Sequence, residues 1–198
     1  MGREFELKYR LSPEQYRLLL PLLPEPARKI AMHTTYYDTP SGALSARKWT
    51  LRLRMEDELA VCTIKTPMSG PGRGEWECRR GDIREAIPEL CKLGCPGELA
   101  SLASEGLVAV CGARFTRLCG PITAGGAEIE LALDAGVLTG GGRELPFTEL
   151  EAELKSGSDG DLIAFCRGLE ARFGLVPEPK SKFRRALALA REGSYGLL

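Results

Sequence analysis

Charged and apolar residues alternate with a period of two along several segments of the chain. Residues 3–10 read Arg-Glu-Phe-Glu-Leu-Lys-Tyr-Arg, and similar alternation recurs further along. Because successive side chains of a strand point to opposite faces, this pattern predicts strands with one charged and one apolar face. The predicted strands cover residues 3–10, 32–38, 50–56, 60–65, 75–79, 107–119, 127–134 and 147–155.

Leucine, isoleucine and alanine recur at helical spacing between some of these strands. Ser12, Pro13 and Gln15 supply an N-cap, a proline for the first turn and a capping-box partner, so a helix is predicted to follow. The predicted helices cover residues 13 to about 23, two parts of 82–105, a segment from Asp159 or Asp161 to Arg172, and 181–191. Together these elements predict a single antiparallel-rich α+β domain over residues 1–198.

The overall charge is balanced, with 27 Lys and Arg against 27 Asp and Glu. This balance excludes a broadly basic protein, so we expect no nucleic acid polymer as a partner. No stretch approaches the roughly 18 apolar residues of a membrane span, and the charged start is unlike a signal peptide. The seven cysteines lack a CxxC pair. Reduced thiols and a cytoplasmic location, with no membrane partner, are therefore expected.

Sorting the strands by face collects acidic and basic residues into two sets. An ordinary solvated sheet face is one interpretation. However, several carboxylates at this spacing repel each other, whereas a divalent cation would neutralise them. Neighbouring arginines and lysines are in turn typical of an anion site such as one for phosphate. Together, the two sets favour a pocket for a metal–polyphosphate complex.

Other motifs have simpler interpretations. The glycine-rich loop 70–74 lacks the Gly-Lys-Ser/Thr ending of a phosphate-binding loop and precedes a strand. Trp49, Trp76, Tyr36 and Tyr37 fall at positions expected to face outward, where aromatic rings pack against covering helices.

Several segments resemble the CYTH family, also called triphosphate tunnel metalloenzymes. Glu4-Phe5-Glu6-Leu7-Lys8 matches the ExExK signature of that family, and further matches follow in the family's order. These are Tyr36 to Pro40, Leu51 to Arg54, Thr63 to Pro67, Leu131 to Gly136, Glu149 to Gly157 and Ser181 to Arg185.

The resemblance implies an eight-stranded, closed antiparallel β-barrel around a charged tunnel, with helices packed outside. It implies metal ligands Glu4, Glu6, Glu151 and Glu153, with Asp134 and Glu149 in support. It implies phosphate-binding residues Lys8, Arg52, Arg54, Lys65, Arg117, Lys182 and Arg185. The expected catalytic residues are Lys8, Lys65 and Glu77, and Glu77 is favoured over Glu75 as the inward carboxylate. Arg114 and Arg117 compete for one role, because a slip of one residue in strand register would exchange them.

The implied activity is hydrolysis of a triphosphate with Mg²⁺ or Mn²⁺, and the motifs favour inorganic tripolyphosphate. Class IV adenylate cyclase and thiamine triphosphatase are alternatives within the same tunnel. A non-catalytic module that binds polyphosphate or nucleotide is a further alternative. A homodimer is one option for the oligomeric state.

Overall fold

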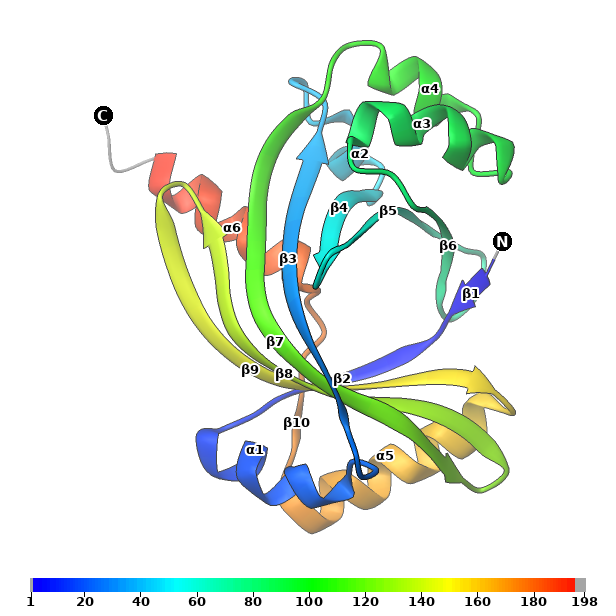
Figure 1. Cartoon of the computed structure of the whole chain (residues 1–198), viewed down its shortest axis with the longest axis vertical. Helices are drawn as coiled ribbons and strands as arrows, with labels where there is room; N and C mark the ends of the chain where they lie inside the picture. Colours follow the sequence, from blue (N-terminus) through cyan, green and yellow to red (C-terminus); the bar gives the residue numbers. More distant parts are fainter. Residues whose placement is uncertain (1, 195–198) are drawn as a thin grey trace.

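The computed structural model describes residues 2–194, which form one curved sheet flanked by helices (Figure 1). The sheet contains ten strands in antiparallel pairing. These are β1 (Gly2–Glu4), β2 (Glu6–Arg10), β3 (Arg28–Asp38), β4 (Thr50–Glu56), β5 (Leu59–Pro67), β6 (Arg73–Cys78), β7 (Val108–Ala124), β8 (Ala127–Gly140), β9 (Arg143–Ser156) and β10 (Val176–Pro177).

The strands follow the order β1-β6-β5-β4-β3-β7-β8-β9-β2-β10, and the sheet is curled into an open half-barrel. The expectation of a closed eight-stranded barrel is therefore wrong. The N-terminal segment explains the difference, because its two halves pair with different strands. Before Phe5 the chain pairs with β6, and after Phe5 it pairs with β9. The backbone at Phe5 thus links the β6 side of the sheet to the β9 side. In a closed barrel, a continuous ladder of hydrogen bonds between strands would join these two sides.

The predicted helices are present, and a short helix at Ala43–Ala46 is additional to them. Ser12 accepts a hydrogen bond from the Gln15 backbone and the Gln15 side chain accepts one from Ser12, so the predicted capping box is confirmed. The helices are α1 (Pro13–Leu19), the 3₁₀ helix η1 (Leu20–Leu22), α2 (Ala43–Ala46), α3 (Ile83–Lys92), α4 (Glu98–Ala103), α5 (Asp159–Phe173) and α6 (Lys182–Ser194).

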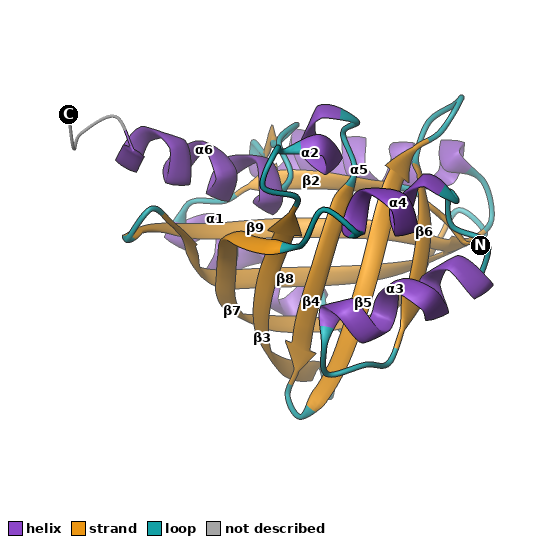
Figure 2. Cartoon of the chain, turned by 90° about the horizontal axis from the view of Figure 1, so that it is seen from above, coloured by secondary structure: helices purple, strands orange, loops and turns teal. Residues whose placement is uncertain are grey.

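Two apolar cores lie on the convex face of the sheet. One core, which includes Leu131 and Leu150, packs the strands β2, β8 and β9 against α1 and α5. The other packs β4 to β6 against α3 and α4 and contains both Trp49 and Trp76, as predicted for these rings. Figure 2 shows α3 and α4 beside β5 and β6. The two layers bury the apolar strand faces, which leaves the charged faces on the concave side.

Helix α6 packs on the concave side instead. Ala186 joins a third apolar cluster with Met32, Phe115 and Phe147, and all of these side chains are buried. The face of β7 that carries Phe115 also carries Arg117, which is turned to the same side. Helix α6 therefore covers part of the concave face and brings its first residues to the charged side chains there.

Candidate functional site

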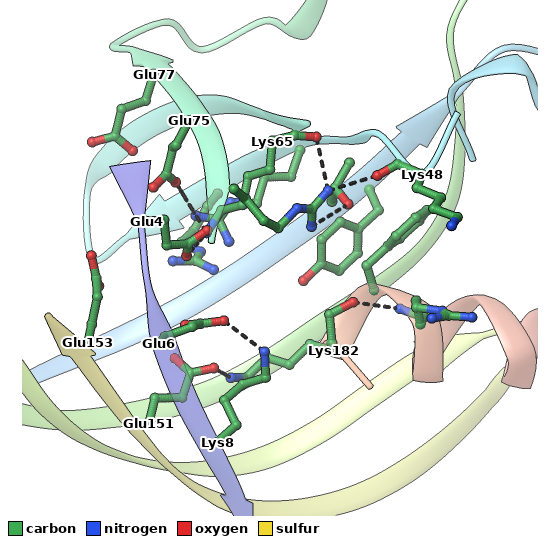
Figure 3. Close-up of a pocket in the computed structure, with 18 of the residues that line it drawn as sticks. Glu4, Glu6, Lys8, Lys48, Lys65, Glu75, Glu77, Glu151, Glu153 and Lys182 are labelled. Atoms are coloured by element: carbon green, nitrogen blue, oxygen red, sulfur yellow. Dashed lines mark hydrogen bonds and ion pairs between the residues drawn. The ribbon is translucent and has the colours of Figure 1, made fainter. Parts of the chain in front are cut away.

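The concave face encloses a cavity of about 1060 Å³ lined mainly by charged side chains (Figure 3). Strand pairing brings many of them together: Glu6 is paired with Glu153 and Lys8 with Glu151, on one face of β2 and β9. The predicted site residues in the lining are Glu4, Glu6, Lys8, Arg52, Arg54, Lys65, Glu77, Arg117, Glu151, Glu153 and Lys182. Asp134, Glu149 and Arg185 are not in the lining and lie behind it.

Three carboxylates and three cations form a buried cluster where α6 meets β7, β8 and β9. Arg117 donates from Nε and Nη2 to both carboxylate oxygens of Asp134, at 2.8 and 2.7 Å. Lys182 Nζ lies 2.7 Å from Asp134 and 2.8 Å from Glu151. Further ion pairs join Arg117 to Glu151, and Lys182 and Arg185 to Glu149. The cluster is formally neutral, because each carboxylate is matched by a cation.

The pKa values in this cluster follow from burial and from these partners. Burial opposes the charge on Lys182, but Asp134, Glu151 and Glu149 outweigh it and raise the pKa of Lys182. Burial also opposes the charge on Glu151, and there Lys182 and Arg117 hold the pKa well below its usual range. For Glu149, burial is the larger effect and raises the pKa.

A second group of acidic residues lies around the N-terminal strands. Glu4 is buried and pairs with Lys65, which also lies 3.2 Å from Glu75. Glu6 accepts a hydrogen bond of 2.7 Å from Lys8. Burial lowers the pKa of Lys8, but Glu6 and Glu151 outweigh it, so the pKa stands above its ordinary value. These carboxylates face the open cavity, whereas Asp134 and Glu149 of the first cluster lie behind its lining.

Three arginines line the cavity and donate no hydrogen bond to a carboxylate among residues 2–194. The nearest carboxylate oxygens lie 3.7 Å from Arg52 (Glu75) and 3.8 Å from Arg54 (Glu56). The buried Nε of Arg52 has no hydrogen-bond partner among residues 2–194. Within residues 2–194, the side chain of Arg73 donates only to Thr50 and to the carbonyl oxygens of Lys48 and Lys65. Burial and the neighbouring charges of Arg52 and Arg117 lower the pKa of Arg54 to about 10. Although burial opposes the charge on Arg52, Glu75 and other neighbours raise the pKa of that arginine. The charge that is least compensated is therefore that of Arg54, and an anion entering here would relieve it.

The structure resolves one choice that the sequence left open. Arg117 faces the cavity, whereas Arg114 is exposed outside it and pairs with Glu144. The preference for Glu77 as the inward carboxylate is not borne out, because Glu75 and Glu77 both line the cavity, Glu75 holds the ion pairs and Glu77 is the more exposed of the two.

Arg73 and Tyr36 are among the lining residues that sequence reasoning missed. Arg73 lies in β6, two residues before Glu75, and was assigned to the preceding loop. Arg73, Glu75 and Glu77 stand at every second position, so a predicted strand that began two residues earlier would have included Arg73 on the same face. Tyr36 also lines the cavity, with its ring 5.1 Å from that of Phe183, so the expectation that it faces outward is wrong. Tyr37 packs outward against the α3 core as expected.

Two sets of carboxylates are candidate metal ligands. Asp134, Glu149 and Glu151 place ligand oxygens within 4.8 Å of one another, so they could hold a cation. Asp134 and Glu149, however, lie behind the lining and are neutralised by Arg117, Lys182 and Arg185, whereas Glu151 also lines the cavity. Glu4, Glu6 and Glu153 line the cavity, and their partners are lysines, whose flexible chains can move aside. Both sets offer only oxygen ligands, which suits hard cations such as Mg²⁺ and Mn²⁺.

Comparison with known proteins identifies the family. The CYTH domain family matches residues 2–187, and the chain therefore belongs to this family. An inorganic triphosphatase of Haemophilus influenzae is 30% identical over 199 residues, which cover 96% of this chain and 55% of that protein. The chain thus spans about half the length of this relative.

Solved structures share the fold. A putative adenylate cyclase from Bacillus halodurans matches with a TM-score of 0.64 and 17% identity, over 93% of this chain and 98% of the other. A putative adenylyl cyclase from Hippeastrum, described as having a dominant triphosphatase activity, matches with a TM-score of 0.63 and 20% identity, over 98% and 96% of the two chains. Within residues 2–194, no helix is long and apolar enough to cross a membrane.

Proposed function

We propose that this chain is a metal-dependent triphosphatase that hydrolyses inorganic tripolyphosphate in the cavity. One observation carries the proposal: in the described part of the chain, Arg52, Arg54 and Arg73 donate no hydrogen bond to a carboxylate, and they share the cavity with Glu4, Glu6 and Glu153. Arginine donors that are not taken up by carboxylates suit the phosphate oxygens, whereas grouped carboxylates suit the cation that accompanies them. The similarity to an inorganic triphosphatase supports the same substrate.

The metal would be held by Glu4, Glu6, Glu151 and Glu153. When bound, Mg²⁺ or Mn²⁺ would neutralise phosphate oxygens and make the terminal phosphorus more open to attack. We assign Asp134 and Glu149 a different role: they hold Lys182 and Arg185 in place and thereby fix the start of α6. The proposed metal ligands thus face the cavity, whereas Asp134 and Glu149 lie behind its wall as counter-ions.

The remaining residues would bind the substrate and handle the proton. Arg52, Arg54, Arg117, Lys8, Lys65 and Lys182 would hold phosphate oxygens, and Lys8 stays protonated because its pKa is raised. The oxygen of water forms a bond to the terminal phosphorus, while the bond from that phosphorus to the bridging oxygen breaks. Phosphate and pyrophosphate leave. Glu77 makes no ion pair among residues 2–194 and would accept the proton of the attacking water.

The proposal is tested by offering the protein three substrates: tripolyphosphate, ATP and thiamine triphosphate, each with Mg²⁺ or Mn²⁺. We expect the highest kcat/KM for tripolyphosphate. Formation of cyclic AMP from ATP would instead support an adenylate cyclase. A higher kcat/KM for thiamine triphosphate would support a thiamine triphosphatase, and binding without turnover would support a binding module. Glu77→Gln should lower kcat by about 10²-fold or more. Glu85→Gln, on the exposed surface of α3, is the matched control and should leave kcat unchanged.

A further inference from the structure

The two ends of the cavity differ in charge. In Figure 3, the labelled glutamates gather on the side of β1, β2 and β6, whereas Lys48 lies on the opposite side, where α6 also lies. The lining residues that belong to segments 41–50 and 179–191 include the exposed cations Lys48, Arg184 and Arg191, and no acidic residue. We refer to this end as the basic mouth.

The cations of the basic mouth have no partners within the described part of the chain. The side chains of Lys48, Arg184 and Arg191 make neither an ion pair nor a hydrogen bond there, whereas most cations deeper in the cavity contact a carboxylate. Like charges at the rim of one cavity repel each other and create a positive potential that attracts an anion. The mouth is therefore suited to an anionic group.

The basic mouth connects with the arginines inside. Lys48 adopts a left-handed backbone with φ of 59°, which is uncommon for a residue with a side chain. Its carbonyl oxygen accepts a hydrogen bond of 2.8 Å from Arg73 Nη2, and Arg73 also donates to Thr50. Thr50, Arg52 and Arg54 follow at every second position of β4 and share one face. A track of basic residues thus runs from Arg54 to Lys48.

We infer that the basic mouth is a second anion subsite, which holds the additional phosphoryl groups of a linear polyphosphate longer than tripolyphosphate. The inference rests on the proposed function, since the first three phosphoryl groups would occupy the interior. The nucleoside of a nucleotide is neutral, so it would make no favourable electrostatic contact with the three unpaired cations of this mouth. Every further phosphoryl group of an inorganic chain, in contrast, adds negative charge there. The mouth therefore favours an inorganic chain over a nucleotide.

The test compares tripolyphosphate with tetrapolyphosphate, both as Mg²⁺ complexes. The triple variant Lys48→Ala/Arg184→Ala/Arg191→Ala should lower the ratio of kcat/KM for tetrapolyphosphate to kcat/KM for tripolyphosphate by about fivefold or more, since each exposed ion pair contributes roughly a two- to fivefold effect. The charge-matched control is Arg17→Ala/Arg167→Ala/Arg172→Ala, on α1 and α5, and it should leave the ratio unchanged.

Two further results decide the inference. In the wild-type protein, added salt should lower this ratio, and in the triple variant it should have little effect, because exposed charges are screened. An unchanged ratio in the triple variant, or an equal loss with ATP, would overturn the subsite. If the wild-type protein hydrolyses neither polyphosphate, the proposed function fails. In that case, calorimetry measures the affinities for tetrapolyphosphate and for tripolyphosphate. A lower ratio of these affinities in the triple variant than in the wild-type protein supports the subsite, and an unchanged ratio overturns it.

Discussion

The ammonium group of Lys182 lies 2.7 Å from a carboxylate oxygen of Asp134, and the two side chains are 5% and 0% exposed. Lys182 is the first residue of α6 and Asp134 lies in β8. This contact therefore fixes the last helix against the concave face of the sheet. Its removal would leave buried carboxylates with fewer cations, which is costly in an environment with little water.

Lys182→Ala should consequently lower the free energy of unfolding by about 3–5 kcal/mol, the usual cost of breaking a buried ion pair. Denaturation in urea measures the change. Lys180→Ala is the control, because Lys180 is exposed and should contribute less than about 0.5 kcal/mol. Equal stability of the two variants would show that the buried cluster does not hold α6 in place.

Arg54→Met should separate stability from binding. Burial and the charges of Arg52 and Arg117 oppose the charge on Arg54, as its lowered pKa of about 10 indicates. Removing this charge should leave the free energy of unfolding unchanged or raise it. The affinity for tripolyphosphate should fall by about 10- to 100-fold, because a hydrogen bond to a charged group is lost. Calorimetry and urea denaturation test both parts, with Arg84→Met on α3 as the control. A variant that loses stability but keeps its affinity would refute this role.

Glu6→Gln should raise the Mg²⁺ concentration needed for half-maximal hydrolysis by at least about tenfold, since an amide is a weaker ligand for a hard cation than a carboxylate. The measurement is a titration of Mg²⁺ at saturating tripolyphosphate, and a chelator should abolish the activity of the wild-type protein. Glu14→Gln, at an exposed position of α1, should leave the requirement unchanged. If Glu6→Gln has the same requirement as Glu14→Gln, then Glu6 is not a ligand.

The thiols of Cys62, which is buried, and of Cys111, which is partly buried, should react slowly. Burial raises the pKa of Cys62 and Cys111 to about 12, so at pH 8 both remain protonated and the reactive thiolate is scarce. In the unfolded chain, with a pKa near 8.5, a substantial share would be thiolate. A disulfide reagent at pH 8 should label these two cysteines much faster in denaturant than in the native protein. Equally fast labelling in both states would contradict their burial.

Most of the elements could be predicted from the sequence because alternation and helix caps are local signals. The strand pattern located the charged faces, and Ser12 with Gln15 located the first helix. The closed barrel was the error. The alternation of residues 3–10 is continuous, so it contains no sign that the chain changes its partner at Phe5. Strand pairing depends on distant segments, which local patterns do not specify.

The sequence predicted which residues come together at the candidate site, but not which of them line the cavity and which lie behind its wall. Alternation placed Glu149 and Glu151 on one face, yet Glu149 lies behind the wall and Glu151 lines the cavity. The difference comes from α6, which covers Glu149 with Lys182 and Arg185. Lys48 could not be predicted either, because it lies in a turn whose left-handed backbone has no alternating pattern.

Hydrolysis in the cavity is tested by following the products of tripolyphosphate with Mg²⁺ over time. We expect one phosphate and one pyrophosphate for each molecule consumed, with the rate lost in Glu77→Gln and retained in Glu85→Gln. Tripolyphosphate that remains intact in the presence of Mg²⁺ and of Mn²⁺ would contradict this expectation.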